Sequence, residues 1–319
     1  MAYSLAGADC IDMAADLAVV KAAKEGLAAA RKVAEKDTAS FRYREPLLMV
    51  SMSAGEDPHF RKAWFDAQLC PQECDRPCEN ICPAAAINDT GVVSDRCYGC
   101  GRCLPICPYG LIEERARPTT LDAIAQTVLT QVDALEIHTQ VGHVAAFKHL
   151  WQTISPWTKN LKLISVSCPD DESLADYLNA IQTITGLGRS NSSASPKLIW
   201  QTDGRPMSGD IGKGTTHAAI KLAQKVLKAD LPGYVQLAGG TNQYTVSKLK
   251  ELGLLGSKSR IKKSFQHVSG VAYGSYARRL LMPVIEQTFY LEEDTDALQT
   301  AVALAESLVN PLKQAAMTS

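Results

Sequence analysis

Short apolar segments alternate with longer helical segments along most of the chain. Seven of the apolar segments have the length of buried strands, and they are residues 10–13, 46–52, 134–138, 161–166, 197–200, 234–237 and 268–273. The pattern predicts helices over residues 17–36, 120–129, 172–185, 216–229, 245–252 and 295–313, and another that ends near residue 153. Residues 1–9 are typical of the end of a helix that Gly7 closes.

Strands that alternate with helices form parallel sheets, because a parallel pair needs a long crossover. We therefore predict an α/β fold: a TIM-barrel-like (β/α) domain that lacks its first strand at the N-terminus. An open doubly wound sheet is the alternative, but the last two units end in glycine-rich loops, as barrels with phosphate sites do. The predicted barrel domain covers residues 1–53 and 114–319, and an insertion occupies residues 54–113.

The insertion contains eight of the ten cysteines of the chain. They form two runs, Cys70-x3-Cys74-x3-Cys78-x3-Cys82-Pro83 and Cys97-x2-Cys100-x2-Cys103-x3-Cys107-Pro108. The second run has the spacing of bacterial ferredoxins, in which the cysteine before proline ligates the other of two iron–sulfur clusters. The two runs indicate an internal duplication, and the segment resembles a two-cluster, α+β ferredoxin domain.

The crossing of ligands between runs divides the cysteines into two sets. One set is expected to hold a [4Fe–4S] cluster and consists of Cys82, Cys97, Cys100 and Cys103. The other set is expected to hold a second cluster and consists of Cys70, Cys78 and Cys107. Cys74 is left open: with it the second cluster is [4Fe–4S], and without it the cluster is [3Fe–4S]. The wide spacing from Cys70 to Cys78 is similar to that of ferredoxins that carry one cluster of each kind.

Paired cysteines also occur in zinc ribbons and in disulfide frameworks. A ribbon uses four thiolates per zinc and needs neither a third cysteine in one run nor a proline after each fourth cysteine. Disulfide frameworks are typical of small secreted chains, whereas this chain has 319 residues and no export signal. Cys10 and Cys168, outside the two runs, are expected to be packed core residues.

Composition limits the remaining classes. A net charge of −1 gives no case for nucleic acid as a partner, since phosphate binding needs clustered positive charge. The short basic patches at Arg61-Lys62 and residues 258–263 are interpreted as solvated faces. No apolar run reaches the length of about 18 residues that a transmembrane segment needs. Free thiols without an export signal indicate a soluble, cytoplasmic protein.

Two glycine-rich loops are candidate cofactor-binding sites. One consists of Gly239, Gly240, Thr241 and Asn242, and the other contains Gly274, Ser275 and Arg278. Their N–H groups can bind a phosphate or the phosphate of a flavin, because both loops are expected on one face of the barrel. We expect Asn242 and Arg278 nearest to such an anion. The alternative is that the glycines only turn strands into helices.

His138 lies at the carboxyl end of a predicted strand, where barrel enzymes place catalytic groups. A lone histidine is more often structural, and we favour that interpretation. Residues 203–215 are not a P-loop, because no lysine follows the second glycine of the candidate motif. Asp203 and Arg205 are the polar candidates of this loop at the barrel mouth.

Three further segments join the cysteine runs in a pattern that extends over essentially the whole chain. They are residues 4–12 (Ser-Leu-Ala-Gly-Ala-Asp-Cys-Ile-Asp), 236–242 (Gln-Leu-Ala-Gly-Gly-Thr-Asn) and 270–278 (Gly-Val-Ala-Tyr-Gly-Ser-Tyr-Ala-Arg). In this order they look like the cyanobacterial light-dependent period protein family. The chain departs from that family at the amino end, where the family has a further strand and helix. A truncated sequence, or an open barrel, is therefore expected.

The resemblance implies an iron–sulfur redox sensor with no catalytic residues. Members of that family are implicated in redox input to the circadian clock, so the implied partners are redox carriers of the electron-transport chain and clock-input proteins. The alternative class is an oxidoreductase, in which a flavin- or phosphate-binding barrel receives electrons from the ferredoxin domain. No clear base or nucleophile at the predicted strand ends supports the enzyme.

Overall fold

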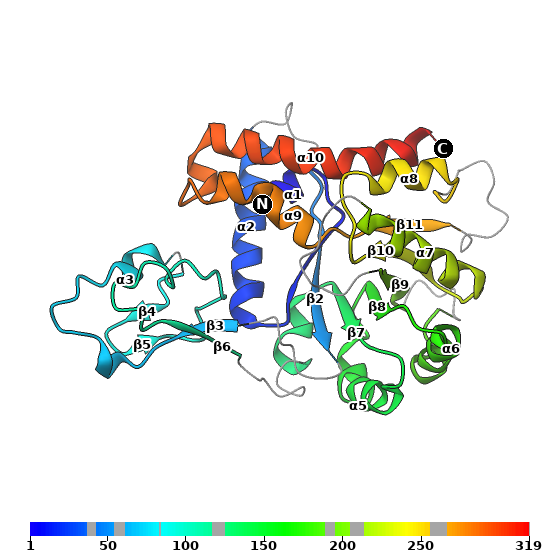
Figure 1. The fold of residues 1–319 in the computed structure, drawn as a ribbon, viewed down its shortest axis with the longest axis horizontal. Coiled ribbons are helices and arrows are strands. Elements are labelled where there is room, and N and C mark those ends of the chain that lie inside the picture. Colours follow the sequence, from blue (N-terminus) through cyan, green and yellow to red (C-terminus); the bar gives the residue numbers. More distant parts are fainter. Residues whose placement is uncertain are drawn as a thin grey trace.

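The largest sheet contains the seven strands that the sequence predicts (Figure 1). In this computed structural model they are β1 (Cys10–Ala14), β2 (Leu47–Ser53), β7 (Ala134–His138), β8 (Leu163–Pro169), β9 (Lys197–Asp203), β10 (Tyr234–Ala238) and β11 (Val268–Val271). The structure describes residues 1–36, 43–53, 61–82, 84–116, 125–188, 195–204, 214–255 and 267–318. All neighbouring strands of this sheet are parallel.

The strands lie side by side in chain order, β1-β2-β7-β8-β9-β10-β11. A doubly wound sheet reverses its strand order at a switch point, so that alternative is wrong. Among the described strands, β1 and β11 form the two edges of the sheet, which curls into a half-barrel without closing. The α/β class and the parallel sheet are confirmed, whereas the TIM-barrel identity stays a prediction.

One face of the sheet is apolar and carries the main core. Alternate strand residues such as Leu135, Ile137, Val166 and Trp200 are at most 1% exposed and pack with the apolar sides of the crossover helices. These helices are α5 (Val144–Ile154), α6 (Leu174–Thr185), α7 (Thr215–Lys228) and α8 (Thr245–Glu251). The intervening residues of the same strands point to the opposite face, because strand side chains alternate.

Four helices near the chain ends form a second core. They are α1 (Ala2–Leu5), α2 (Leu17–Lys36), α9 (Ser275–Ile285) and α10 (Thr295–Thr318). Leu5, Ala30, Leu281 and Ala301 belong to this core. Figure 1 shows α10 crossing above α1 and α9, so the two ends of the described chain are packed together.

The cysteine-rich segment between β2 and β7 has a hydrophobic core of its own. In it, β3 (Arg61–Trp64) pairs antiparallel with β6 (Glu113–Ala116), and β4 (Ile87–Asn88) with β5 (Gly91–Val92). The short helices η1 (Ala67–Leu69) and α3 (Pro77–Ile81) complete it. We call this part, residues 61–116, the small domain; Figure 1 shows it beside the foot of α2. The predicted boundary at 54–113 stays a prediction.

A buried ion pair joins the small domain to the sheet. Lys62 of β3 is 5% exposed, and its Nζ lies 2.8 Å from Oδ2 of Asp16, between β1 and α2. Lys62 also donates to the carbonyl of Ser94 over 2.7 Å. Oδ1 of the same Asp16 accepts the N–H of Ala18 at the start of α2. The interpretation of Lys62 as part of a solvated patch is therefore wrong.

Most predicted elements agree with the structure. All seven strands are present, helix 17–36 has the bounds of α2, and Gly7 ends α1 with φ 87°. Helix α9 was not predicted, and the start of helix 120–129 and the basic patch at 258–263 lie outside the described residues. The described part also contains η2 (Leu129–Gln131), η3 (Ser155–Trp157) and η5 (Leu291–Glu293). None of its helices is long and apolar enough to span a membrane.

Candidate functional site

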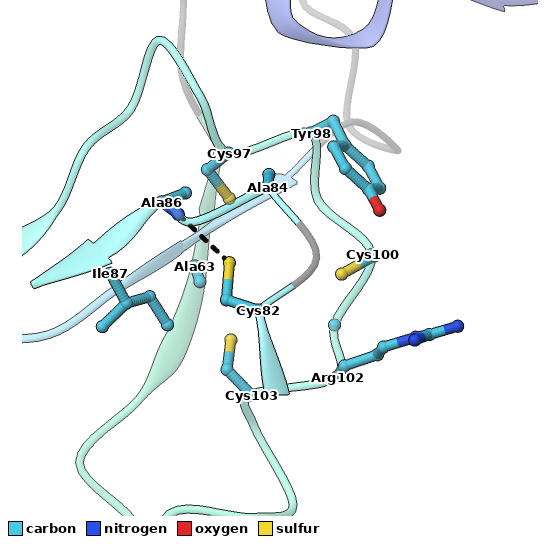
Figure 2. Close-up of a pocket in the computed structure, with 11 residues that line it drawn as sticks. Ala63, Cys82, Ala84, Ala86, Ile87, Cys97, Tyr98, Cys100, Arg102 and Cys103 are labelled. Atoms are coloured by element: carbon cyan, nitrogen blue, oxygen red, sulfur yellow. Dashed lines mark hydrogen bonds between the residues drawn. The ribbon is translucent and has the colours of Figure 1, made fainter. Parts of the chain in front are cut away.

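Four cysteines surround a hollow in the small domain (Figure 2). The hollow has a volume of ≈ 350 Å³, part of it open solvent, and its thiols belong to Cys82, Cys97, Cys100 and Cys103. Figure 2 shows their sulfur atoms pointing inward, opposite the apolar wall of Ala63, Ala86 and Ile87. The structure thus brings one cysteine of the first run to three of the second, as the crossing of ligands requires.

The other four cysteines of the runs form a second group. Partial burial, the neighbouring thiol of Cys74 and a hydrogen bond with it raise the pKa of Cys70, and Cys107 acts in the same direction. Burial and the nearby Cys107 likewise raise the pKa of Cys78. Cys74, which the sequence left open, is therefore placed beside Cys70 in this second group.

Backbone N–H groups point at the sulfur that precedes each of the two prolines. The N–H of Ala86 donates to Sγ of Cys82 over 3.3 Å. At the equivalent place in the second run, burial raises the pKa of Cys107, but the N–H groups of residues 109–112 outweigh it and lower that pKa overall. Such donors favour a thiolate, the form that ligates metal. The matching surroundings agree with an internal duplication.

The thiols are arranged around space rather than against one another. Within the described residues, no three Cys, His, Asp or Glu side chains converge closely enough to hold a single metal ion. All ten cysteines are free, so the structure contains no disulfide framework. Burial and the neighbouring thiols of Cys100, Cys97 and Cys82 raise the pKa of Cys103 to about 12. The separation of the thiols around the hollow suits a multinuclear cluster better than a single tetrahedral ion.

The two remaining cysteines lie in the large domain, which is the described part of the chain outside the small domain. Cys168 is 3% exposed and belongs to the main core, as expected. Cys10 is partly buried on β1.

The two glycine-rich loops lie side by side, as predicted. The hydroxyl of Thr241 donates to the carbonyl of Ala272 over 2.5 Å, and Tyr276 donates to Gln243 over 2.9 Å. Gly239 and Gly240 have φ of 58° and 90°, a region that favours glycine. The loops after β10 and β11 therefore form one continuous surface at the carboxyl ends of the strands.

The polar side chains of these loops have protein partners. Asn242 is 1% exposed; its Nδ2 donates to Thr215 over 3.2 Å and its Oδ1 accepts the N–H of Tyr244 at the start of α8. Arg278 is exposed on α9 and donates to Ser275 over 3.3 Å. These contacts give Asn242 a structural explanation, and the flavin or phosphate ligand stays a prediction.

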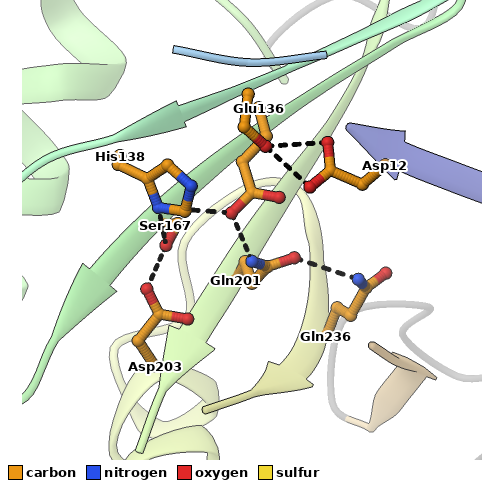
Figure 3. Close-up of polar contacts among 8 residues, drawn as sticks. Asp12, Glu136, His138, Ser167, Gln201, Asp203 and Gln236 are labelled. Atoms are coloured by element: carbon orange, nitrogen blue, oxygen red, sulfur yellow. Dashed lines mark hydrogen bonds and ion pairs between the residues drawn. The ribbon is translucent and has the colours of Figure 1, made fainter. Parts of the chain in front are cut away.

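A network of polar side chains crosses the inner face of the sheet, which is the face opposite the main core (Figure 3). Nδ1 of His138 lies 3.1 Å from Oγ of Ser167, and Ser167 donates to a carboxylate oxygen of Asp203. His138 also lies 3.5 Å from Oε1 of Glu136. His138 and Asp203, singled out separately from the sequence, are thus brought together, whereas Arg205 lies outside the described residues.

The network continues toward both edges of the sheet. Nε2 of Gln201 donates to Oε1 of Glu136 over 2.5 Å, and Gln236 donates to Gln201 over 3.1 Å. On the other side, Ser51 donates to Asp12 over 2.7 Å. We call these residues the inner-face cluster: Asp12, Ser51, Glu136, His138, Ser167, Gln201, Asp203 and Gln236. Most of it was missed, although polar residues at alternate strand positions were the available signal.

Glu136 is the most deeply buried carboxyl of the cluster, at 3% exposed. Burial, followed by the carboxylates of Asp12 and Asp203, raises its pKa well above the ordinary value. A folded-state pKa above the unfolded value lowers stability as pH rises from the unfolded pKa toward the folded one. The loss is about 1.4 kcal/mol for each pKa unit of elevation.

Replacing Glu136 by glutamine is therefore expected to raise the melting temperature at pH 8 by about 2–4 °C. The difference from wild type should shrink toward pH 5, because the native carboxyl is then protonated. Asp12, Asp203 and His138 face the same group and remain in both proteins.

Asp133→Asn is the matched control for this measurement. Partial burial raises the pKa of Asp133, but the hydrogen bonds from Lys162 and from the N–H of Leu48, together with the charges of Lys162 and Lys24, outweigh it and lower that pKa. This variant should therefore melt lower than wild type at pH 8. A lower melting temperature for Glu136→Gln at pH 8 would contradict the argument.

The thiol groups and the fold together define a class: an α/β protein with an iron–sulfur-binding segment. A model of the LdpA Fe-S cluster-binding domain matches residues 70–118, and a model of the Light dependent period A C-terminal domain matches residues 127–311. "Light dependent period A" of Synechococcus elongatus is 50% identical over 320 residues, which span 99% of this chain and 86% of that protein. The chain belongs to the light dependent period A family.

A shorter similarity connects the chain to electron-transport proteins. "Electron transport protein HydN" of Escherichia coli strain K12 is 46% identical over 56 residues, 16% of this chain and 32% of that protein. The protein of the same name from Escherichia coli O157:H7 is similar to the same extent, with 46% identity over 56 residues and the same shares of both chains. No solved structure matches the chain.

Proposed function

We propose that the chain is an iron–sulfur redox sensor, whose clusters exchange electrons with carriers of the electron-transport chain and whose state is read by clock-input proteins. The observation that carries the proposal is the division of eight cysteines into two groups of four within one small domain. The family membership and the likeness to electron-transport proteins support it. The clock role is carried over from the family resemblance, since the Synechococcus relative bears the name "Light dependent period A".

Each group of thiols is assigned to one cluster. Cys82, Cys97, Cys100 and Cys103 hold a [4Fe–4S] cluster, and Cys70, Cys74, Cys78 and Cys107 hold the other. Cys74 is included because its thiol lies close enough to that of Cys70 to help raise the pKa of Cys70, which favours [4Fe–4S] over [3Fe–4S] for the second cluster. Bound clusters of this kind supply one-electron storage, with a potential set by burial and by hydrogen bonds to sulfur.

Two features of the residues around the thiols bear on how the clusters would exchange electrons. N–H groups of residues 109–112 stabilise the Cys107 thiolate. Cys100 is exposed, whereas Cys97 and Cys103 are buried, so the first group has one ligand on the side from which a carrier can approach. We also propose that the small domain has a ferredoxin-like fold and that the large domain is barrel-like.

The oxidoreductase alternative requires a flavin or phosphate ligand in the large domain. No described contact favours it over the sensor, since Thr241 and Asn242 are engaged with Ala272, Thr215 and Tyr244. Both functions are tested on protein purified without oxygen, by iron and flavin assays and a reductive titration followed by EPR. About eight irons per chain, no flavin and reversible reduction by a physiological carrier support the sensor. Stoichiometric flavin, or clusters that remain inert over the physiological range, would contradict it.

Replacing Cys74 by alanine tests the second cluster. Wild-type protein is expected to lack an EPR signal as isolated, since oxidised four-iron clusters are silent. The variant should lose about one iron per chain and show a near-isotropic signal in the oxidised state, typical of three irons. Cys10→Ala is the matched control and should keep the wild-type iron content. The same oxidised-state signal in wild-type protein would show that Cys74 is not a ligand.

A further inference from the structure

The inner-face cluster places carboxylates where a parallel sheet is usually apolar. Parallel sheets are commonly buried on both faces by hydrophobic side chains. Here Asp12, Glu136 and Asp203 come from three different strands and face the same side of the sheet, as Figure 3 shows. Buried carboxylates are costly unless a positive group or several donors compensate them.

The compensation inside the described residues is incomplete. Among the described residues, the structure shows one ion pair for these three carboxylates, between Glu136 and His138 at 3.5 Å. The other contacts are neutral donors: Ser51 to Asp12, Gln201 to Glu136 and Ser167 to Asp203. Burial raises the pKa of Asp203, and burial together with the carboxylates of Asp12 and Asp203 raises that of Glu136, as expected for carboxylates withdrawn from water.

An unpartnered hydroxyl gives an independent indication of a ligand. Ser165 of β8 is 1% exposed, and its Oγ has no hydrogen-bond partner. It pairs in register with Glu136 and lies two residues before Ser167, so both serines point to the inner face. The intervening Val166 belongs to the apolar core on the other side. Buried hydroxyls without partners are rare in folded proteins.

The cluster is accessible from solvent at its rim. Asp12 is exposed, and the side chain of His138 is 33% exposed. Glu136, Ser165 and Gln201 lie deeper, at 6% exposure or less. A small molecule can therefore reach the rim first and place a polar group against the buried acceptors.

We propose that the inner-face cluster binds a small organic cation that carries a primary ammonium or a guanidinium group. Such a group donates several hydrogen bonds and brings a full positive charge to Glu136 and Asp203. Asp12 already has the charge of Arg278 near it, which lowers its pKa against the raising effect of burial. A single metal ion fits less well, since no three His, Cys, Asp or Glu side chains of the described residues converge on one point. The site is separate from the small domain and does not depend on the iron–sulfur clusters.

The test is calorimetry on the cluster-loaded full chain with agmatine, putrescine and methylammonium as probes. Butane-1,4-diol serves as the uncharged control, and MgCl₂ and MnCl₂ are titrated alone. Glu136→Gln and Asp203→Asn should each weaken binding of the organic cation at least tenfold. Asp12→Asn, at the exposed rim, serves as a further variant in case a buried substitution fails to fold.

Asp170→Asn is the matched control because Asp170 carries the same charge, lies just after β8 and pairs with Lys225 at the surface. It should bind the probes as wild type does. The proposal is overturned if none of the three amines binds or if the diol binds equally well. Equal loss in Asp170→Asn, unchanged binding in the folded cluster variants, or binding of the metal ions without the amines would overturn it too.

Discussion

Replacing Cys103 by serine is expected to remove about half of the iron from the chain and to open the part of the small domain around Cys82, Cys97 and Cys100 to protease. Cys103 is 6% exposed and belongs both to the hollow of Figure 2 and to the core of the small domain. That core contains few buried apolar side chains apart from cysteines, and small domains of this kind depend on bound metal for their folding. Iron analysis, together with limited proteolysis mapped by mass spectrometry, measures both effects.

The large domain should be unaffected by this substitution, because its two cores contain no residue of the small domain. New cleavage sites are therefore expected within residues 61–116 and not in the sheet. Cys168→Ser is the matched control: it is equally buried but lies in the main core, so it should lower the melting temperature and leave the iron content intact. Full iron retention in Cys103→Ser would refute the assignment of Cys103 as a ligand.

Replacing Lys62 by methionine is expected to destabilise the protein by about 3–5 kcal/mol, the usual cost of breaking a buried ion pair. The change leaves Asp16, whose side chain is only 16% exposed, without its cation. It also leaves the carbonyl of Ser94 without its donor. The melting temperature should fall by about 5 °C or more in a chain of this size, and differential scanning calorimetry measures the fall.

The Asp16→Asn substitution completes a double-mutant cycle. Asparagine keeps an oxygen for the N–H of Ala18 at the start of α2 but removes the charge. The double variant should therefore be more stable than Lys62→Met alone, by an amount on the order of 1–3 kcal/mol. Additive effects of the two substitutions would show that the ion pair does not couple the small domain to the sheet.

The backbone of this fold was largely readable because its signals are local. A short window of sequence is enough to predict the strand at residues 197–200 and the Ala-, Lys- and Glu-rich helix at residues 17–36. Helix α9 was missed because Pro283 lies inside it, and proline normally argues against a helix interior. The division of cysteines between two groups followed from ferredoxin chemistry, but the placement of Cys74 depends on the path of the chain through α3.

The polar contacts were less predictable because they join distant segments. Lys62 stands next to Arg61 and looks like a surface residue until the fold brings Asp16 to it. Glu136 is an acidic residue in a short apolar strand, and nothing near it in sequence shows that Asp12 and Asp203 face the same side. Such groupings are set by strand order and register, which a single sequence does not contain.

The position of the small domain has a consequence for how the chain can change. It lies within one crossover, between β2 and β7, which pair directly as neighbours. The entropic cost of closing such a connection grows only with the logarithm of its length, so the sheet tolerates a long insertion between these two strands. Exchanging the small domain for another electron carrier, or shortening it to a plain linker, should leave the strand order unchanged. The crossover is therefore an insertion site, and a new redox partner could be acquired there without redesigning the rest of the protein.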